Sequence, residues 1–253
     1  MARMSAEMHC GSLPASHPGL VPGTAVRTSG CGRGFDVVCA IAGLLLLWPV
    51  LLLVALLILI LDGWPVFFRQ ARVGLGGKLF RIWKFRTMRT EAPGAEGPLV
   101  TAAGDPRITR FGRWLRTSKL DELPQLINVL VGEMSVIGPR PEVPRYVNLE
   151  DPVWQAVLAV RPGITDLATL AHLDEERTLF ACDDPESYYR ETILPGKLAL
   201  NVKYLQLKSW RTDVRLILLT LQSILHLGCR GQGWIREFLS TEIAWQTHVK
   251  NDQ

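Results

Sequence analysis

"VVCAIAGLLLLWPVLLLVALLILIL", residues 37–61, decides what kind of protein this chain can be. These 25 residues carry no charged side chain and lie between Asp36 and Asp62. A run of about 18 to 20 apolar residues already marks a membrane segment, and a straight helix of this length would reach about 37 Å. The sequence therefore predicts a helix that enters a lipid bilayer.

Pro49 lies in the middle of this run, where a proline removes a backbone hydrogen bond and bends or breaks a helix. Each half would then be about 18 Å long, roughly half of a bilayer. Basic residues mark the cytoplasmic side of a membrane segment, and they occur on both flanks, at Arg33 and again from Arg69 onward. We therefore expect a re-entrant helix hairpin over residues 33–62, broken at Trp48 and Pro49, with a spanning helix as the alternative.

Composition and charge limit the remaining function classes. The chain has 253 residues, is 48% hydrophobic and has a net charge of +4, which is too little for a general nucleic-acid binder. The positive charge is concentrated, however, with eleven basic and three acidic residues between positions 69 and 116, so this region is expected to bind anions. The five cysteines are scattered and predict neither a disulfide framework nor a zinc site. Residues 1–30, rich in Gly, Ser and Pro, are typical of a flexible tail.

Basic and apolar residues alternate in residues 65–89 around a glycine turn, which predicts a short β-hairpin at the membrane interface. Further on, Arg116 ends a series of arginines at every third position, and it is our candidate phosphate ligand because a guanidinium group binds phosphate through a two-pronged contact. Pro139 and Pro141 rule out an ordinary helix around Arg140. Arg140 is therefore expected on a stiff loop, as a ligand clamp or as part of a structural turn.

Asp121 and Glu122 allow two interpretations. Ser118 followed three residues later by a carboxylate resembles a helix-capping box, and Pro124 suits the start of a helix. Alternatively, the pair does chemistry beside the arginines: one carboxylate attacks a phosphoryl group or holds a hard cation such as Mg²⁺, and the other orients its partner. Capping and catalysis do not exclude each other, and both stay open on these residues alone.

Taken together, these motifs resemble the bacterial monotopic phosphoglycosyl transferases, also called polyprenol-phosphate sugar-1-phosphate transferases, in their small form. The resemblance covers roughly residues 33–212. It rests on seven blocks in order: "RGFDVV" (33–38), "PVFFRQARVG" (65–74), "KFRTM" (84–88), "GDPRITRFGRWLR" (104–116), "LDELPQLINVLVGEMSVIGPRP" (120–141), "RPGIT" (161–165) and "LPGKLALNVKYLQLKSWRTD" (194–213).

The resemblance implies a reaction in two steps. Asp121 would attack the β-phosphate of a UDP-sugar and release UMP, and the phosphate of a polyprenol lipid (undecaprenyl phosphate) would then take the phosphosugar from the enzyme. Glu122 would assist, with deprotonation of the acceptor as one role, and Mg²⁺ would bind near Asp121. Substrate contacts are expected from Arg116, Arg140 and Gln125, with Pro139 and Pro141 holding Arg140 in place. Trp48 and Lys119 depart from the usual family pattern.

The resemblance also implies the architecture and the location. We expect an α+β, mainly helical protein in which a re-entrant membrane helix (33–62) precedes a small cytosolic catalytic domain (63–212) and C-terminal amphipathic helices (213–253). It would lie on the cytosolic face of the bacterial inner (cytoplasmic) membrane, contact phospholipid and bind no nucleic acid. The alternatives are a non-enzymatic basic membrane adaptor and a metal-dependent diphosphate hydrolase. The sugar stays open, as does the oligomeric state, for which a homodimer is one alternative.

Overall fold

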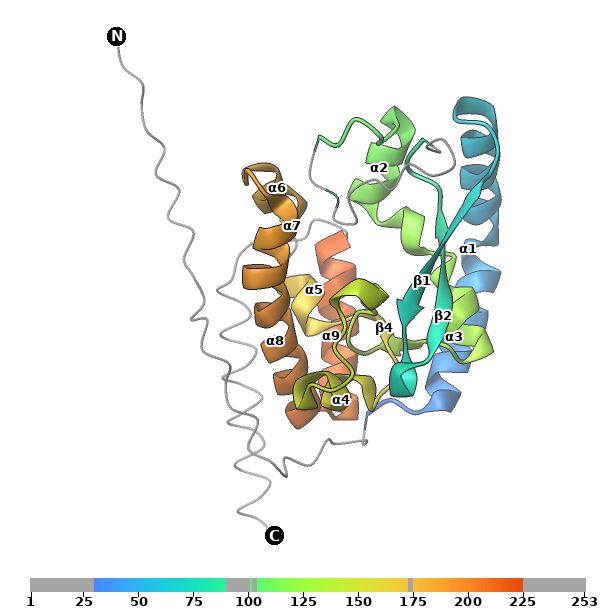
Figure 1. Cartoon of the computed structure of the whole chain (residues 1–253). Helices are drawn as coiled ribbons and strands as arrows, with labels where there is room; N and C mark the ends of the chain where they lie inside the picture. The colour runs from blue at the N-terminus through green and yellow to red at the C-terminus, as the bar shows by residue number, and fades with distance from the viewer. Residues whose placement is uncertain (1–29, 90–100, 102–103, 173–174, 225–253) are drawn as a thin grey trace.

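The computed structural model describes residues 30–89, 101, 104–172 and 175–224, and this part of the chain is mainly helical (Figure 1). Its longer helices are α1 (Arg33–Leu61), α8 (Leu194–Leu207) and α9 (Trp210–Ile224). The shorter helices are α2 (Arg110–Ser118), α3 (Gln125–Val131), α4 (Pro152–Leu158), α5 (Leu167–Ala171), α6 (Glu175–Phe180) and α7 (Pro185–Tyr188). The strands are β1 (Phe67–Val73), β2 (Leu79–Phe85), β3 (Ser135–Ile137) and β4 (Gly163–Thr165).

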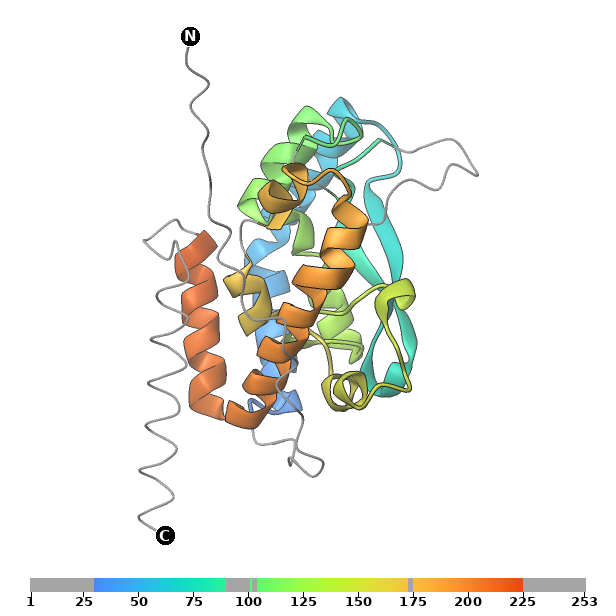
Figure 2. The same ribbon diagram turned by 60° about the vertical axis from the view of Figure 1, so that its left-hand side comes forward.

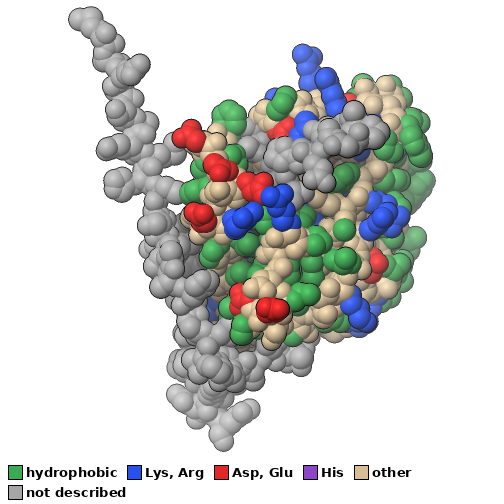
Figure 3. All heavy atoms as spheres, viewed as in Figure 1, with side chains coloured by type: hydrophobic (Ala, Val, Ile, Leu, Met, Phe, Trp, Pro, Cys, Tyr) green, Lys and Arg blue, Asp and Glu red, His purple; other side chains and the backbone are tan. Residues whose placement is uncertain are grey.

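Helix α1 contains the whole apolar run. It continues through Pro49 as one helix, so the predicted break into two helices at Trp48 and Pro49 is not seen, and both side chains are exposed. One stripe, including Ala40, Val54 and Ile58, is buried against the rest of the protein. Hydrophobic side chains gather along the edge of the molecule where α1 lies (Figure 3). The exposed large apolar side chains of this helix are Val38, Ile41, Leu45, Leu46, Trp48, Leu52, Leu53, Leu56, Leu59, Ile60 and Leu61.

Both ends of α1 are hydrogen-bonded to the domain beside it. At the start of the helix, the buried Asp36 carboxylate accepts from the Ser135 hydroxyl (2.8 Å) and from the Val136 backbone N–H (3.0 Å). At its end, the Asp62 carboxylate accepts from the Thr109 hydroxyl (2.9 Å), and the Arg86 guanidinium donates to the Asp62 carbonyl oxygen (2.6 Å). The helix therefore lies along the domain and does not project from it.

The predicted β-hairpin is confirmed. Strands β1 and β2 pair antiparallel, from Phe67 opposite Phe85 to Val73 opposite Leu79. The turn between them contains Gly76 and Gly77 at φ 64° and 78°, a left-handed conformation that glycine adopts at little cost. The hairpin runs beside α1 and α3 (Figure 1), and its inner face carries the buried side chains of Phe80 and Ile82.

A short parallel pair of strands, β3 and β4, has Ser135 opposite Gly163 and contacts α1, α3 and α9. Helices α8 and α9 meet at a corner near Lys208, and in Figure 2 α9 lies at the side of the molecule away from the hairpin. Tyr204 and Leu216, which come from these two helices, are almost fully buried in the core beside Ile137. Strand β3 contacts α3, which begins shortly after Asp121 and Glu122 in the chain.

The predicted α+β, mainly helical class is confirmed, but not every predicted segment is described. The N-terminal tail lies outside the described residues, except for residue 30. Of the predicted C-terminal helices, residues 213–224 belong to α9, and residues 225–253 lie outside the described part. The described cysteines Cys31, Cys39 and Cys182 are free thiols, as expected.

Candidate active site

Asp121 and Glu122 lie in a short 3₁₀ turn, Leu120–Glu122, between α2 and α3. Helix α2 ends at Lys119, whose φ of 58° is left-handed and uncommon for a residue with a side chain. Ser118 donates to the carbonyl oxygens of Trp114 and Leu115 in the preceding turn and does not cap a following helix. The capping-box interpretation is therefore wrong, because α3 begins later, at Gln125, without a side-chain cap.

Glu122 holds two cations from distant parts of the chain. Arg140 makes a two-pronged contact with it, from Nη1 to Oε2 at 3.1 Å and from Nη2 to Oε1, and Lys84 Nζ lies 2.8 Å from Oε1. These cations hold the pKa of Glu122 well below its usual range although burial opposes this, and the charge of Glu122 raises the pKa of Arg140. Burial lowers the pKa of Lys84. Glu122 is thus an ionised carboxylate with both oxygens engaged.

Asp121 has the opposite environment. Asp121 is only 5% exposed, and its Oδ1 has no hydrogen-bond partner in the described part of the chain. Burial, and then the negative charge of Glu122, raises the pKa of Asp121 to about 6, while Lys84, Arg116 and Lys119 oppose the shift. A carboxylate in this state is ionised at neutral pH and has a free oxygen, as a nucleophile or a metal ligand requires.

The loop around Arg140 is held on three sides, as the two prolines predict. The carbonyl oxygen of Pro139 accepts from Gly163 N–H (3.0 Å), and that of Pro141 accepts from Arg72 (3.2 Å). The backbone N–H of Arg140 points at the Asp166 carboxylate (3.3 Å). Pro139 and Pro141 are buried. Arg140 thus lies on a hydrogen-bonded loop, and its guanidinium contacts Glu122 of the acidic pair. That the two prolines hold this loop rigid stays a prediction.

Arg116 and Gln125 are placed less directly. Arg116 lies in the last turn of α2, close enough for its charge to lower the pKa of Asp121, and its Nη2 forms an ion pair with Glu176 of α6. Gln125 is 1% exposed, and its amide nitrogen has no partner within the described residues. Both expected roles in substrate binding stay predictions.

Sequence reasoning missed Lys84, which was counted only among the basic residues near the membrane. The alternation of strand β2 contained a signal: Phe80, Ile82 and Lys84 occupy every second position, and the first two face the core. By the same period, Lys84 faces inward and reaches Glu122. Glu176 and Asp166 carried no comparable local signal.

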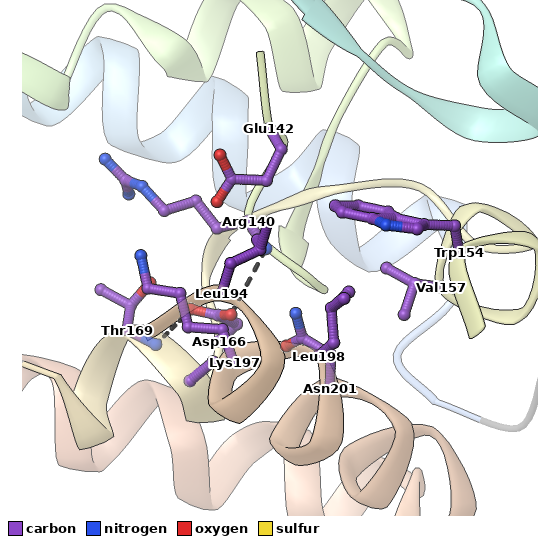
Figure 4. A pocket seen from close by; sticks show the side chains of 11 residues that line it. Arg140, Glu142, Trp154, Val157, Asp166, Thr169, Leu194, Lys197, Leu198 and Asn201 are labelled. Carbon is purple, nitrogen blue, oxygen red and sulfur yellow. Dashed lines mark hydrogen bonds between the residues drawn. The ribbon is translucent and has the colours of Figure 1, made fainter. Parts of the chain in front are cut away.

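A pocket lies beside Arg140 (Figure 4). Asp166, at its floor, accepts from the backbone N–H groups of Arg140 and Thr169. Lys197 and Asn201 of α8 face the same space, and Asn201 Oδ1 is buried with no partner in the described part of the chain. Asp121 and Glu122 do not line this pocket, but Arg140, which does, contacts Glu122.

Asp121 offers an oxygen ligand for a magnesium ion, the cofactor expected from the sequence, whereas both oxygens of Glu122 are engaged with cations. Among the residues that the structure describes, no three His, Cys, Asp or Glu side chains gather as a metal-binding group. Mg²⁺ does not need such a group, because it commonly takes one or two carboxylates together with substrate phosphates and water. The unpartnered Oδ1 of Asp121 is a suitable oxygen ligand for this mode of binding.

Comparisons with known proteins agree on one family. The family model described as bacterial sugar transferase matches residues 28–227. A UDP-glucose:undecaprenyl-phosphate glucose-1-phosphate transferase of Caulobacter vibrioides is 39% identical over 198 residues, which cover 76% of this chain and 69% of that protein. An undecaprenyl-phosphate glucose phosphotransferase of Komagataeibacter xylinus is 37% identical over 198 residues, or 75% of this chain but 35% of that protein.

A third relative acts on a different sugar. The UDP-N-acetylgalactosamine-undecaprenyl-phosphate N-acetylgalactosaminephosphotransferase of Aeromonas hydrophila is 43% identical over 145 residues, or 55% of this chain and 34% of that protein. The chain therefore spans about a third of the length of two of these relatives and about two thirds of the other. With a family model that covers most of its length and an acidic pair surrounded by cations, this chain belongs to the bacterial sugar transferase family.

Proposed function

We propose that this protein transfers a sugar-1-phosphate from a UDP-sugar to undecaprenyl phosphate, giving a polyprenyl-diphosphate sugar and UMP. The observation that carries the proposal is the environment of Asp121, a buried carboxylate with a free oxygen and a raised pKa among cations. The names of the relatives support the two substrates. Such a reaction would begin the assembly of a bacterial surface polysaccharide, in agreement with an exopolysaccharide production protein of Rhizobium leguminosarum that is 44% identical over 148 residues.

In the first step, an oxygen of Asp121 attacks the phosphorus atom that carries the sugar. The bond from this phosphorus to the bridging oxygen breaks, UMP leaves, and the phosphosugar is bonded to the aspartate. In the second step, an oxygen of undecaprenyl phosphate attacks the same phosphorus, and the Asp121 carboxylate is released unchanged. Negative charge develops on the phosphoryl oxygens in both steps, and nearby guanidinium groups stabilise it.

Glu122 positions cations in this scheme. Its two oxygens are engaged with Arg140 and Lys84, and its pKa is held low, so it is a weak proton acceptor in this state. The acceptor needs little help, because a phosphate monoester with a second pKa of about 6 is mostly ionised at neutral pH. The sequence-based expectation that Glu122 deprotonates the acceptor stays a prediction that this geometry does not favour. Mg²⁺, when bound through Asp121, would neutralise charge on the donor diphosphate.

We further propose that α1 inserts into the cytosolic face of the inner membrane with both of its ends on the cytosolic side. A helix of 29 residues is about 43 Å long, and hydrogen bonds to one domain hold both of its ends, at Asp36 and at Asp62. A helix that crossed the bilayer would carry these two ends to opposite sides, whereas a polar domain stays on one side. One-sided insertion therefore agrees better with the two anchored ends than a spanning helix does.

The topology can be tested with single thiols at Gly32 and Trp64, which flank α1 in open or exposed positions. In a cysteine-free background, an impermeant reagent should modify both thiols from the cytosolic side of sealed vesicles. Modification of the two positions from opposite sides would exclude re-entrance.

The transfer itself is tested by UMP release from membranes supplied with a panel of UDP-sugars. Release should depend on undecaprenyl phosphate beyond the first turnover, and a trapped enzyme should gain the mass of a phosphosugar on Asp121. Continued release without acceptor would favour a hydrolase. No release with any UDP-sugar, together with intact membrane binding, would favour the adaptor.

A further inference from the structure

Arg116, the cation expected to bind phosphate, is already occupied by a carboxylate of the protein itself. Its Nη2 forms an ion pair with Glu176 from α6, which lies 60 residues away in the chain. Arg116 Nε is buried and has no partner in the described part of the chain. Glu176 therefore accepts from Nη2 of this guanidinium and leaves the Nε–H donor without a partner among the described residues.

Two other cations near Asp121 are held more firmly. Lys84 and Arg140 share Glu122, whose side chain is 14% exposed. The side chain of Glu176, in contrast, is 44% exposed, so its ion pair with Arg116 contributes little and its carboxylate can turn into water instead. Of the carboxylates that hold cations at this site, Glu176 is the one that an incoming anion displaces most easily.

The backbone of α6 does not need to move for this exchange. Its Leu179 is 1% exposed within the core, and the neighbouring Glu175 forms an ion pair with Lys197 of α8 at 2.6 Å. Lys197 itself lies over the ring of Tyr189. These contacts anchor the helix, so a change of the Glu176 side chain alone frees Arg116.

We propose that Glu176 takes the place of a donor phosphate in the empty enzyme and is displaced from Arg116 when the nucleotide diphosphate binds. This inference rests on the proposed function, because it takes the donor to be a UDP-sugar. A phosphate group can accept from both Nε and Nη2 of Arg116, whereas Glu176 is bonded to Nη2 alone. The exchange thus gives the buried Nε–H a hydrogen-bond acceptor. A ligand without a phosphate cannot supply this acceptor, so its affinity does not depend on Glu176.

The test compares the binding of UDP and of uridine to the full-length protein in lipid nanodiscs with Mg²⁺, by titration calorimetry. Glu176→Gln keeps the shape of the side chain and removes its charge. Because a partly exposed ion pair contributes modestly, the Kd for UDP should fall about two- to fivefold in this variant, and the Kd for uridine should not change. Glu186→Gln is the matched control, since Glu186 pairs with the exposed Arg145 and Arg190 and should leave both constants as they are.

The outcomes separate this inference from the proposed function. A Kd for UDP that is unchanged or higher in Glu176→Gln would overturn the displacement and make Glu176 a residue that positions Arg116. Equal tightening of UDP and uridine would overturn it as well, because the gain would not depend on phosphate. If UDP binds to neither the wild type nor the variant, the proposed donor is wrong and both proposals fail.

Discussion

Replacing Asp121 by Asn should have two opposite effects. It should abolish the covalent intermediate and the transfer, because an amide is not a nucleophile toward phosphorus. It should also stabilise the folded protein at neutral pH, because the wild type must keep a charged carboxylate buried there. A residue that only capped a helix would behave differently, since Asn caps helices about as well as Asp.

The size of the stabilisation follows from the pKa. Burial and the charge of Glu122 raise the pKa of Asp121 from 3.8 to about 6 in the folded protein. The folded wild type then binds a proton at Asp121 more tightly than the unfolded chain does. Protonation of Asp121 therefore stabilises the wild type fully below about pH 3.8, and this contribution is lost as the pH rises through about 6. At 1.36 kcal/mol per pKa unit, the full loss is about 3 kcal/mol, and roughly 1.4 kcal/mol of it falls between pH 5 and 7.5.

The assay is denaturant unfolding of the wild type and of Asp121→Asn in the same detergent at pH 5 and 7.5. The free energy of unfolding of the variant, relative to the wild type, should rise by roughly 1.4 kcal/mol between the two pH values. Asp105→Asn is the control. Hydrogen bonds from Arg107 lower the pKa of Asp105, so the Asp105 carboxylate is ionised in both the folded and the unfolded protein over this pH range. An equal pH dependence of the wild type and Asp121→Asn would refute the buried, charged environment, and full-speed product formation by the variant would refute the nucleophile.

Three further predictions concern the surroundings of the carboxylate. Arg140→Lys loses the two-pronged contact with Glu122, so single-turnover UMP release should slow by about 10²-fold, and an unchanged rate would contradict the role of the guanidinium. Gly112→Ala would place a Cβ 2.0 Å from the carbonyl oxygen of Thr87, so the free energy of unfolding should fall by about 1 to 3 kcal/mol, and an unchanged unfolding midpoint would contradict this packing. Chelation of divalent cations should stop UMP release and added Mg²⁺ should restore it, whereas release that survives a chelator would exclude the metal.

The parts of the fold that the sequence predicted are those with local signals. The β-hairpin followed from alternation around adjacent glycines, and the rigid loop followed from the two prolines around Arg140. The apolar helix followed from length and composition, with its start near Arg33 and its end near Leu61. In each case the residues that determine the local structure are close together in the chain, so the backbone sterics of those residues decide it directly.

The parts that it did not predict depend on contacts between distant segments. Ser118 and Asp121 have the spacing of a capping box, but the left-handed Lys119 ends α2 and turns the chain before α3 begins. Lys84 and Glu122 are 38 residues apart, and they meet only because β2 packs beside the 3₁₀ turn. The ion pair of Arg116 with Glu176 requires α6 to be in place first. Spacing alone could not distinguish these outcomes.

The packing of α1 connects the membrane to the chemistry. Leu120, the residue before the proposed nucleophile, packs with Val54 and Ile58 of α1 in the same cluster as Leu115. In the proposed insertion, the position of α1 in the lipid sets how deep the carboxylate of Asp121 lies, because Leu120, its neighbour in the chain, packs on the cluster that α1 helps to form. A polyprenol phosphate carries its charge at the membrane surface and its tail in the hydrocarbon. If α1 inserts as proposed, an acidic pair whose neighbour Leu120 packs on the α1 cluster would receive the phosphate of the proposed acceptor without drawing its tail out of the bilayer.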